Sequence, residues 1–406
     1  MSSPASPPAG FIWLFLEGNP GEPDALYLEI PTSRIRKSSL KPGKYLRFLS
    51  YAILAVDGTI AQSPGPTLDL VADESQLDDC GVYIFYPSEI KTSEELSARR
   101  ADVEVVKQRS QFGASESARL DSFADAISVR DAVSFFNSVP SMFTHAMHIV
   151  AHARGTPWIL HLINSRRGFE DDEGVTDLDD IDDPRNGFCG EVRLHPMFDA
   201  SVCAILKTPN HILDMNDIPP ALVRSFDDNS ESHPTDVRYT LQYLDENPKY
   251  ESAYIPNNSD AAFKSNHDTS LRPSALLFHY RYGASALVKW GKGLDKRIPP
   301  SRPPEAITAT VGQVVTTNPQ LQDERKKNRD FKREEQGMQG TSHNNTAWTT
   351  EAVLETYHPL DVLRMISPSY NPEIDEAFDQ DVEVQECPQL PEGFTDNIAK
   401  WRNAVV

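Results

Sequence analysis

The sequence predicts an α+β protein with a folded middle and a disordered C-terminal tail. Short apolar runs between Gly- and Pro-containing turns predict strands near the N-terminus. Apolar residues at intervals of three and four predict helices further along the chain. Only 39% of the 406 residues are hydrophobic and 31 are Pro, a composition poorer in apolar residues and richer in Pro than an ordinary globular domain. Part of the chain is therefore expected to stay outside the hydrophobic core, and the length predicts two or three domains.

The first ninety residues predict a disordered start and a small β-rich module. Residues 1–9 are small residues and Pro, a composition typical of a disordered tail. Residues 10–90 contain short apolar runs separated by turn signals, which predicts a β-rich N-terminal module. Its strands are expected at Phe11–Leu16, Ala25–Ile30, Tyr45–Leu49, Ile53–Val56 and Val82–Tyr86.

A helical region is expected to follow this module. Residues 91–116 carry charged side chains at helical spacing, which predicts a connecting helix. The segment Ser117–Asp131 predicts a second helix, because four apolar residues recur on one face. They are Leu120, Phe123, Ala124 and Ile127.

Residues 117–291 are expected to form the main domain of the chain. Its further predicted elements are short. They are separated by an acidic loop over residues 170–183, in which nine of the fourteen residues are Asp or Glu. We expect this loop to be a solvated surface loop, with a role in binding a divalent cation as the alternative. Strands are predicted at Val133–Phe136, Met147–Val150, Val202–Leu206 and Val237–Leu244, and helices at Thr156–Asn164, Arg193–Asp199 and Pro273–Trp290.

The last part of the chain predicts little packed structure. Residues 292–350 are rich in Pro, Gln and charge, which is typical of a disordered linker. This linker holds a basic cluster at 325–333, which could attract phosphate or an import receptor or could simply be a solvated linker. Residues 351–406 are expected to form an acidic, Pro-rich tail with one short helix over Val353–Met365.

Charge and composition narrow the possible functions. The formal net charge is −21, which repels nucleic acid at long range and argues against a protein that coats DNA. It is compatible with an enzyme that neutralises phosphate locally with a metal ion and a few arginines. No run of eighteen apolar residues exists and the four cysteines form no CxxC motif, so we expect an intracellular protein of the nucleus or cytoplasm without a membrane partner.

Three polar motifs stand in sequence in the main domain. Five of the eleven histidines lie between residues 145 and 195. Histidine together with Asn and Asp is the set of side chains that metal-assisted hydrolysis uses. The motifs read AMHIVAHARG at 146–155, DDPRNG at 182–187 and LHPMFD at 194–199.

In this order the three motifs resemble the HNH endonuclease family, and most closely its fungal branch, over roughly residues 117–291. The resemblance implies a ββα-metal fold, in which two strands and one helix hold a single divalent cation such as Mg, Mn or Zn. It implies that His148 is the general base, that Asn186 fixes the active-site loop and that His195 is a metal ligand. The implied activity is hydrolysis of nucleic acid, with DNA expected as the substrate rather than RNA.

The residue chemistry agrees with that implied activity. An imidazole with a pKa near 6.5 can accept a proton from water near neutral pH, and a hard cation stabilises the negative charge that develops on a phosphate. Asp199 follows His195 by one helical turn and is a candidate second ligand or an orienting partner. His152 is a candidate ligand or phosphate donor, and Arg154 and Arg185 are candidates to bind substrate phosphate.

One position departs from the family pattern. Many HNH proteins place a ligand directly before the base, whereas this chain has Met147, whose thioether does not suit a hard cation. The pattern therefore predicts that Met147→Asp strengthens cation binding. Two functions stay open: a metal-dependent endonuclease, or a catalytically degenerate HNH-like scaffold that acts as an interaction protein.

Overall fold

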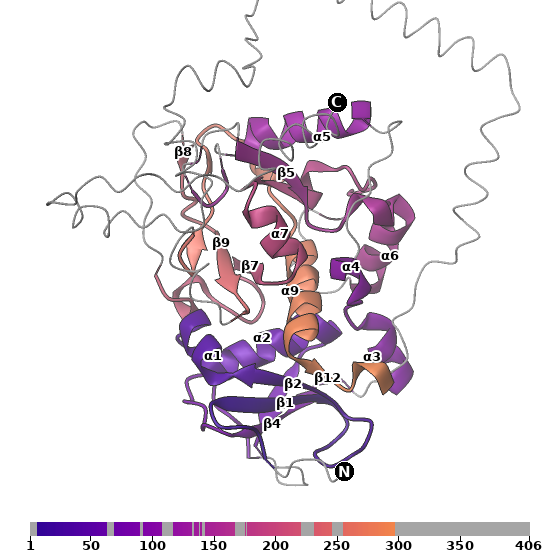
Figure 1. Cartoon of the computed structure of the whole chain (residues 1–406), viewed down its shortest axis with the longest axis vertical. Helices are drawn as coiled ribbons and strands as arrows, with labels where there is room; N and C mark the ends of the chain where they lie inside the picture. The colour runs from indigo at the N-terminus through magenta and orange to yellow at the C-terminus, as the bar shows by residue number, and fades with distance from the viewer. Residues whose placement is uncertain are drawn as a thin grey trace, which may run out of the picture. The chain divides into compact units, whose positions relative to one another are not determined.

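A computed structural model describes residues 6–62, 69–89, 92–107, 117–131, 134–137, 139, 143–166, 175, 177–220, 231–245 and 255–296. They form a mixed α+β structure (Figure 1). The predicted disordered linker begins at 292, but Lys292 belongs to a strand and Leu294–Lys296 to a 3-10 turn. The rest of the linker from 297 onward, the basic cluster at 325–333 and the tail after it lie outside the described residues. In the described part of the chain, every helix is too short or too polar to cross a membrane.

A five-stranded sheet forms one end of this structure, and its strands come from both ends of the described chain. β1 pairs with β2 antiparallel and with β4 parallel, and β12 adds to the edge of β2. The strand order is β12-β2-β1-β4-β3. The strands are β1 (Phe11–Glu17), β2 (Leu26–Pro31), β3 (Gly58–Ala61), β4 (Val82–Pro87) and β12 (Gly291–Lys292).

Two helices pack on this sheet, and they correct the sequence prediction. They are α1 (Thr32–Ser38) and α2 (Pro42–Leu54). The predicted strands Tyr45–Leu49 and Ile53–Val56 are wrong, because all of the first and the first half of the second belong to α2. Its apolar residues are nearly continuous because α2 lies between the sheet and another buried helix, so that almost all of its sides are buried. Such a helix resembles a pair of strands in sequence.

The connecting region is also different from the prediction. Two short helices, α3 (Ser93–Arg99) and α4 (Glu104–Lys107), take the place of the single helix expected over 91–116, of which 108–116 lie outside the described residues. α3 ends because Arg100 adopts an extended backbone with ψ 139°. The amide of Ala101 then donates to the carbonyl of Ile53 at 2.7 Å, which ties the connection to α2.

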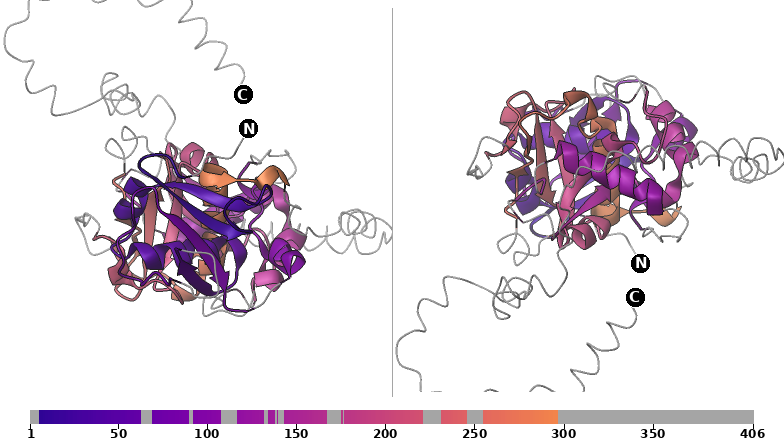
Figure 2. Two further views of the ribbon diagram at one scale, coloured as in Figure 1. Left: turned by 90° about the horizontal axis from the view of Figure 1, so that it is seen from below. Right: turned by 90° about the horizontal axis from the view of Figure 1, so that it is seen from above.

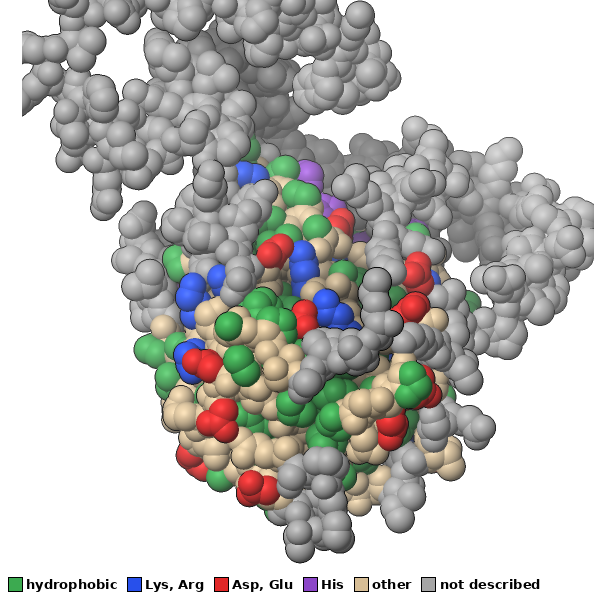
Figure 3. All heavy atoms as spheres, turned by 60° about the horizontal axis from the view of Figure 1, so that its bottom comes forward, with side chains coloured by type: hydrophobic (Ala, Val, Ile, Leu, Met, Phe, Trp, Pro, Cys, Tyr) green, Lys and Arg blue, Asp and Glu red, His purple; other side chains and the backbone are tan. Residues whose placement is uncertain are grey.

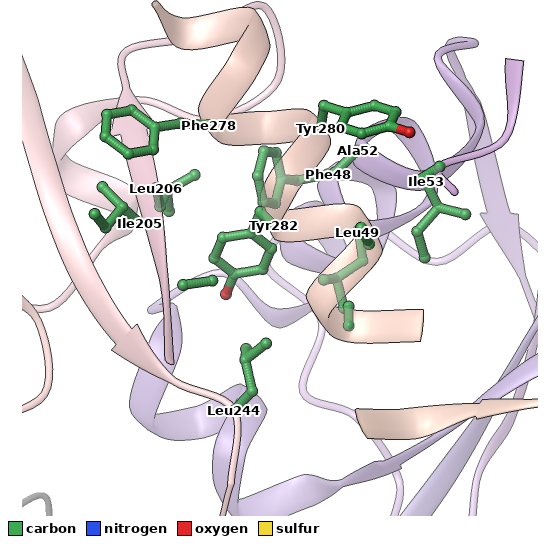
Figure 4. Close-up of a cluster of buried hydrophobic side chains, with 14 of the residues drawn as sticks. Phe48, Leu49, Ala52, Ile53, Ile205, Leu206, Leu244, Phe278, Tyr280 and Tyr282 are labelled. Carbon is green, nitrogen blue, oxygen red and sulfur yellow. The ribbon is translucent and has the colours of Figure 1, made fainter. Parts of the chain in front are cut away.

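The helix α9 (Ala275–Trp290) runs through the centre of the described structure and joins its two ends (Figure 1). It packs against α2 on one side and against β7 (Cys203–Thr208) on the other, and Figure 4 shows the apolar side chains between them. Gly283 permits the close contact with α2, because a Cβ there would lie 2.2 Å from the carbonyl oxygen of Ala52. One continuous hydrophobic core therefore extends from the N-terminal sheet into the region 117–291.

The elements at the other end carry the three polar motifs. Their central feature is the antiparallel pair β5–β6, in which His148 pairs with Gly187. Seen from above, α5 lies across this end (Figure 2). The elements are α5 (Ser117–Arg130), β5 (Thr144–His148), α6 (Thr156–Arg166), β6 (Gly187–Glu191) and α7 (Leu194–Asp199).

Most predictions for this region are confirmed. The helices α5, α6, α7 and α9 and the strands β7 and β9 (Arg238–Tyr243) lie where the patterns placed them. β5 ends at His148 and does not continue to Val150. Residues 134–137 form a bend instead of the predicted strand Val133–Phe136, since Phe135 is held by single hydrogen bonds to Cys189 and Ala262.

The remaining strands and turns of the described residues are short. They connect the larger elements and lie mainly beside β9 and at the turns of the polar motifs. The strands are β8 (Glu231–Ser232), β10 (Ser259–Asp260) and β11 (Phe263–Lys264), and the 3-10 turns are His152–Arg154, Pro184–Asn186, Met215–Asp217, Thr269–Leu271 and Leu294–Lys296. On the face shown in Figure 3, acidic and basic side chains are interspersed among hydrophobic and polar ones.

Candidate functional site

His148 lies at the end of β5, on the face of the strand pair that α5 covers. Side chains alternate along a strand, so Ala146 shares this face and packs with Phe123 of α5. The Phe123 ring stacks on the His148 imidazole, with 3.9 Å between centroids and 8° between planes. Gly187, opposite His148, makes room for this stack, because a Cβ there would lie 2.3 Å from Phe123 Cζ. Phe123, from the apolar stripe of α5, thus holds the ring of the candidate base.

A carboxylate that the sequence analysis did not single out binds this histidine. His148 Nε2 lies 3.1 Å from Asp182 Oδ1, and His152 Nε2 lies 3.5 Å from the same oxygen. The three side chains are 9–14% exposed. Asp182 belongs to the acidic loop, whose described end is folded onto the protein: Asp180 accepts a hydrogen bond from Thr156 Oγ1 at 3.1 Å. The signal available in the sequence was its place as the first residue of the DDPRNG motif.

Burial controls the protonation of His148. It lowers the pKa of the imidazole below 6.5, because a charged ring loses hydration in this position. Asp182 raises the pKa through its hydrogen bond and charge, while His152 and His195 lower it when they are protonated. The net direction is downward, so the ring is neutral at pH 7 and able to accept a proton.

Asn186 holds the turn that follows His148. Its Oδ1 accepts a hydrogen bond from the amide of Val150 at 2.9 Å, and its Nδ2 donates to the carbonyls of Val150 at 3.0 Å and Ile181 at 2.8 Å. The backbone adds a fourth contact, from the amide of Ile149 to the carbonyl of Asn186 at 2.8 Å. Because Asn186 is fully buried, these bonds join the first two polar motifs into one rigid unit.

The predicted metal ligands fall into two groups. His195 and Asp199 lie one turn apart on α7, with 3.5 Å between Nε2 and Oδ2, and each side chain is 37% exposed. His152 lies instead beside Asp182. Among the described residues, no three His, Cys, Asp or Glu side chains are grouped so that they could hold a metal ion. The structure therefore brings two of the three predicted ligands together and leaves His152 with the candidate base.

Met147 faces the opposite side of the strand from His148. It is 1% exposed and belongs to the main hydrophobic core. A Cβ on Gly190 would lie 2.4 Å from its sulfur and 3.4 Å from Cδ2 of Leu194, which places the thioether between the strand pair and α7. The expectation that Met147→Asp restores a ligand needs correction, because the carboxylate would enter an apolar region and oppose folding.

The two predicted phosphate-binding arginines point to other partners. Arg185 donates to Asp183 through Nε at 2.9 Å and Nη2 at 2.7 Å, and to Asp177 through Nη1 at 2.5 Å. These carboxylates raise its pKa further above the usual value. Arg154 lies over the ring of Trp158, with 5.8 Å from Cζ to the centroid. In this arrangement Arg185 stabilises the acidic loop and Arg154 packs on α6, and a role of either arginine in binding phosphate stays a prediction.

Comparisons of the chain with protein-family models, with curated proteins and with solved structures find no match. The resemblance to HNH endonucleases therefore depends on the three sequence motifs alone.

Proposed function

We propose that the chain is an HNH-type phosphodiesterase that hydrolyses nucleic acid with His148 as general base. The observation that carries the proposal is the unit made by Asn186, which fixes the turn after β5 and thereby the position of His148 beside Asp182. The order β5, β6, α7 provides two strands and one helix, as a ββα-metal core would need. Such an order supports the proposal, since the first His ends a strand and His195 lies on the helix.

The chemistry follows from the His148–Asp182 pair. With its proton on Nε2, His148 donates to the Asp182 carboxylate and keeps a lone pair on Nδ1. That nitrogen accepts a proton from water as the water oxygen attacks phosphorus, and Asp182 stabilises the imidazolium that forms. One P–O bond forms and the bond to the leaving oxygen breaks. His152, which lies beside the same carboxylate, supplies a proton to the leaving oxygen.

A divalent cation would add positive charge at the phosphate. The three predicted donors do not fit one ion as a set, because His152 lies at Asp182 while His195 and Asp199 lie on α7. No step is therefore assigned to a cation. The exposed His195–Asp199 pair offers one nitrogen and one carboxylate, a donor set compatible with Mg, Mn or Zn when water completes the coordination.

Met147 favours a second candidate function, a non-catalytic interaction scaffold. The position at which HNH proteins often carry a ligand is filled here by a buried thioether. The His148 side chain is itself only 9% exposed, so little of the ring is accessible to a substrate. In this alternative the hydrogen-bonded unit around Asn186 stabilises the fold and has no chemical role.

Cleavage assays distinguish these two functions. Plasmid DNA and a structured RNA are each incubated with the full chain in chelator and with added Mg, Mn or Zn. We expect His148→Ala to lower cleavage by roughly 10²–10⁴-fold, the usual effect of losing a general base. His161→Ala, on α6, is the matched control and is expected to cleave normally. Equal cleavage by the His148 variant refutes the assignment, and no cleavage by the parent protein under any condition favours the scaffold.

A further inference from the structure

The last turn of α5 ends in a buried ion pair that is separate from the histidines. Arg130 and Asp131 are adjacent in sequence, and their side chains are 1% and 0% exposed. Arg130 donates to both carboxylate oxygens of Asp131, from Nε at 2.6 Å and from Nη2 at 3.0 Å. An ion pair this deeply buried is stable only when its remaining polar atoms are also bonded.

The remaining donors of Arg130 all bind backbone carbonyls. Nη1 donates to Pro184 at 2.7 Å and to Leu271 at 2.8 Å, and Nη2 donates to Gly187 at 2.7 Å. The guanidinium thus uses its five N–H groups in five hydrogen bonds. Asp131 extends the same set, because its Oδ2 also accepts the amide of Cys189 at 2.7 Å.

Two of these carbonyls flank Asn186 in the sequence. Pro184 and Gly187 lie on either side of the segment Arg185–Asn186, so Arg130 donates hydrogen bonds to the backbone both before and after Asn186. Asn186 in turn bonds both backbone polar groups of Val150. The hydrogen bonds therefore form a continuous path from α5 to the turn after His148.

We propose that Arg130 is a positioning residue for His148, which it places through the backbone around Asn186; this inference rests on the proposed role of His148 as the base. The same helix also contributes Phe123, which stacks on the imidazole. α5 thus holds His148 in two ways, through ring contact and through the loop. Only a planar group with five donors reaches all of these partners, since a lysine ammonium has three donors and no fork.

A matched control exists elsewhere in the chain. Arg166 of α6 is also buried and donates to three backbone carbonyls, at 2.9 Å, 2.7 Å and 2.8 Å. Its partners are Ala52, Ile53 and Arg99. None of these belongs to the β5–β6 pair or to the loop of Asn186, so Arg166→Lys reproduces the loss of a buried guanidinium without touching the path to His148.

The test measures amide hydrogen exchange and histidine NMR titration on the full chain. The amide of Val150 donates to Asn186, and the buried amide of Thr32 donates to the carbonyl of Gly10 beside the N-terminal sheet and serves as an internal reference. In Arg130→Lys we expect the ratio of the Val150 to the Thr32 exchange rate to rise roughly 10-fold or more, because local opening of the loop becomes easier. The titration of His148 should shift as well.

In Arg166→Lys the exchange ratio and the His148 titration should both stay at parent values. An unchanged ratio in Arg130→Lys, or an equal rise in both variants, overturns the proposal. If Arg130→Lys does not fold, Asp131→Asn replaces it, because this change keeps the guanidinium and weakens the bidentate pair that orients it; the same exchange ratio then decides.

Cleavage separates this inference from the proposed function. If the parent protein cleaves, Arg130→Lys should lower kcat and leave KM unchanged, because the substrate contacts persist while the base is misplaced. If the parent protein does not cleave but the exchange ratio rises in Arg130→Lys, the proposed hydrolysis is refuted. Arg130 then stabilises the loop but has no catalytic base to position. Cleavage that depends on His148, with no change in the ratio, refutes only the role of Arg130.

Discussion

Replacing Asn186 by Ala tests the loop that holds His148, and the structure sets the size of the effect. The change removes one acceptor and two donor contacts at a fully buried position. The amide of Val150 loses its partner, which costs about 2 kcal/mol for a buried donor. The carbonyls of Val150 and Ile181 each lose one bond at about 1 kcal/mol. The free energy of unfolding should therefore fall by about 4 kcal/mol.

Gln242→Ala is the matched control for this variant. Gln242 is also fully buried and makes three side-chain hydrogen bonds, to Ser38, Asn258 and Tyr282. Urea denaturation should show a similar loss of stability in the two variants. Only Asn186→Ala should change the NMR titration of His148 and, if the protein cleaves nucleic acid, abolish most of the cleavage.

Two results would refute this reasoning. A loss of less than about 1 kcal/mol in Asn186→Ala would show that the loop keeps its conformation without the amide, because that is the effect of a single ordinary hydrogen bond. An equal change of the His148 titration in both variants would show that the histidine responds to general destabilisation and not to the loop.

Three further outcomes are expected. Met147→Asp should lower the free energy of unfolding by about 3 kcal/mol or more in urea, since an unpaired carboxylate enters the core, whereas Met147→Leu should cost less than about 1.5 kcal/mol; a stable Met147→Asp protein that binds Mg would contradict the packing. Gly187→Ala should cost about 1–3 kcal/mol by displacing Phe123 and should remove the ring-current shift on His148, so unchanged spectra would refute the stack. Because the pKa of His148 is lowered on folding, the unfolded chain binds the proton more readily, and stability should fall as the pH drops below about 6.5. His148→Gln should lack this part of the pH dependence in denaturation curves between about pH 7 and pH 5, and an identical slope in both proteins would argue against it.

Local patterns predicted several elements well. The 3.6-residue spacing in α5 and α9 and the turn chemistry around β1 and β2 are properties of neighbouring residues, so they can be read without knowledge of the fold. The same spacing was missed for Tyr45–Leu49, because α2 is buried on most of its surface and only Lys44 and Arg47 leave a narrow polar stripe to reveal its period. β12 could not be foreseen either, since a two-residue strand is defined only by its partner β2.

In the candidate site, too, the sequence predicted some features and the fold decided others. The sequence by itself determined the three polar motifs, their order and the identities of His148, Asn186 and His195. Only the tertiary structure decided that Asp182 binds His148 and that Met147 packs into the core. The physical reason is that a motif specifies which side chains are present, whereas strand alternation and the packing of α5 and α7 on opposite faces of β5 and β6 set which of them meet.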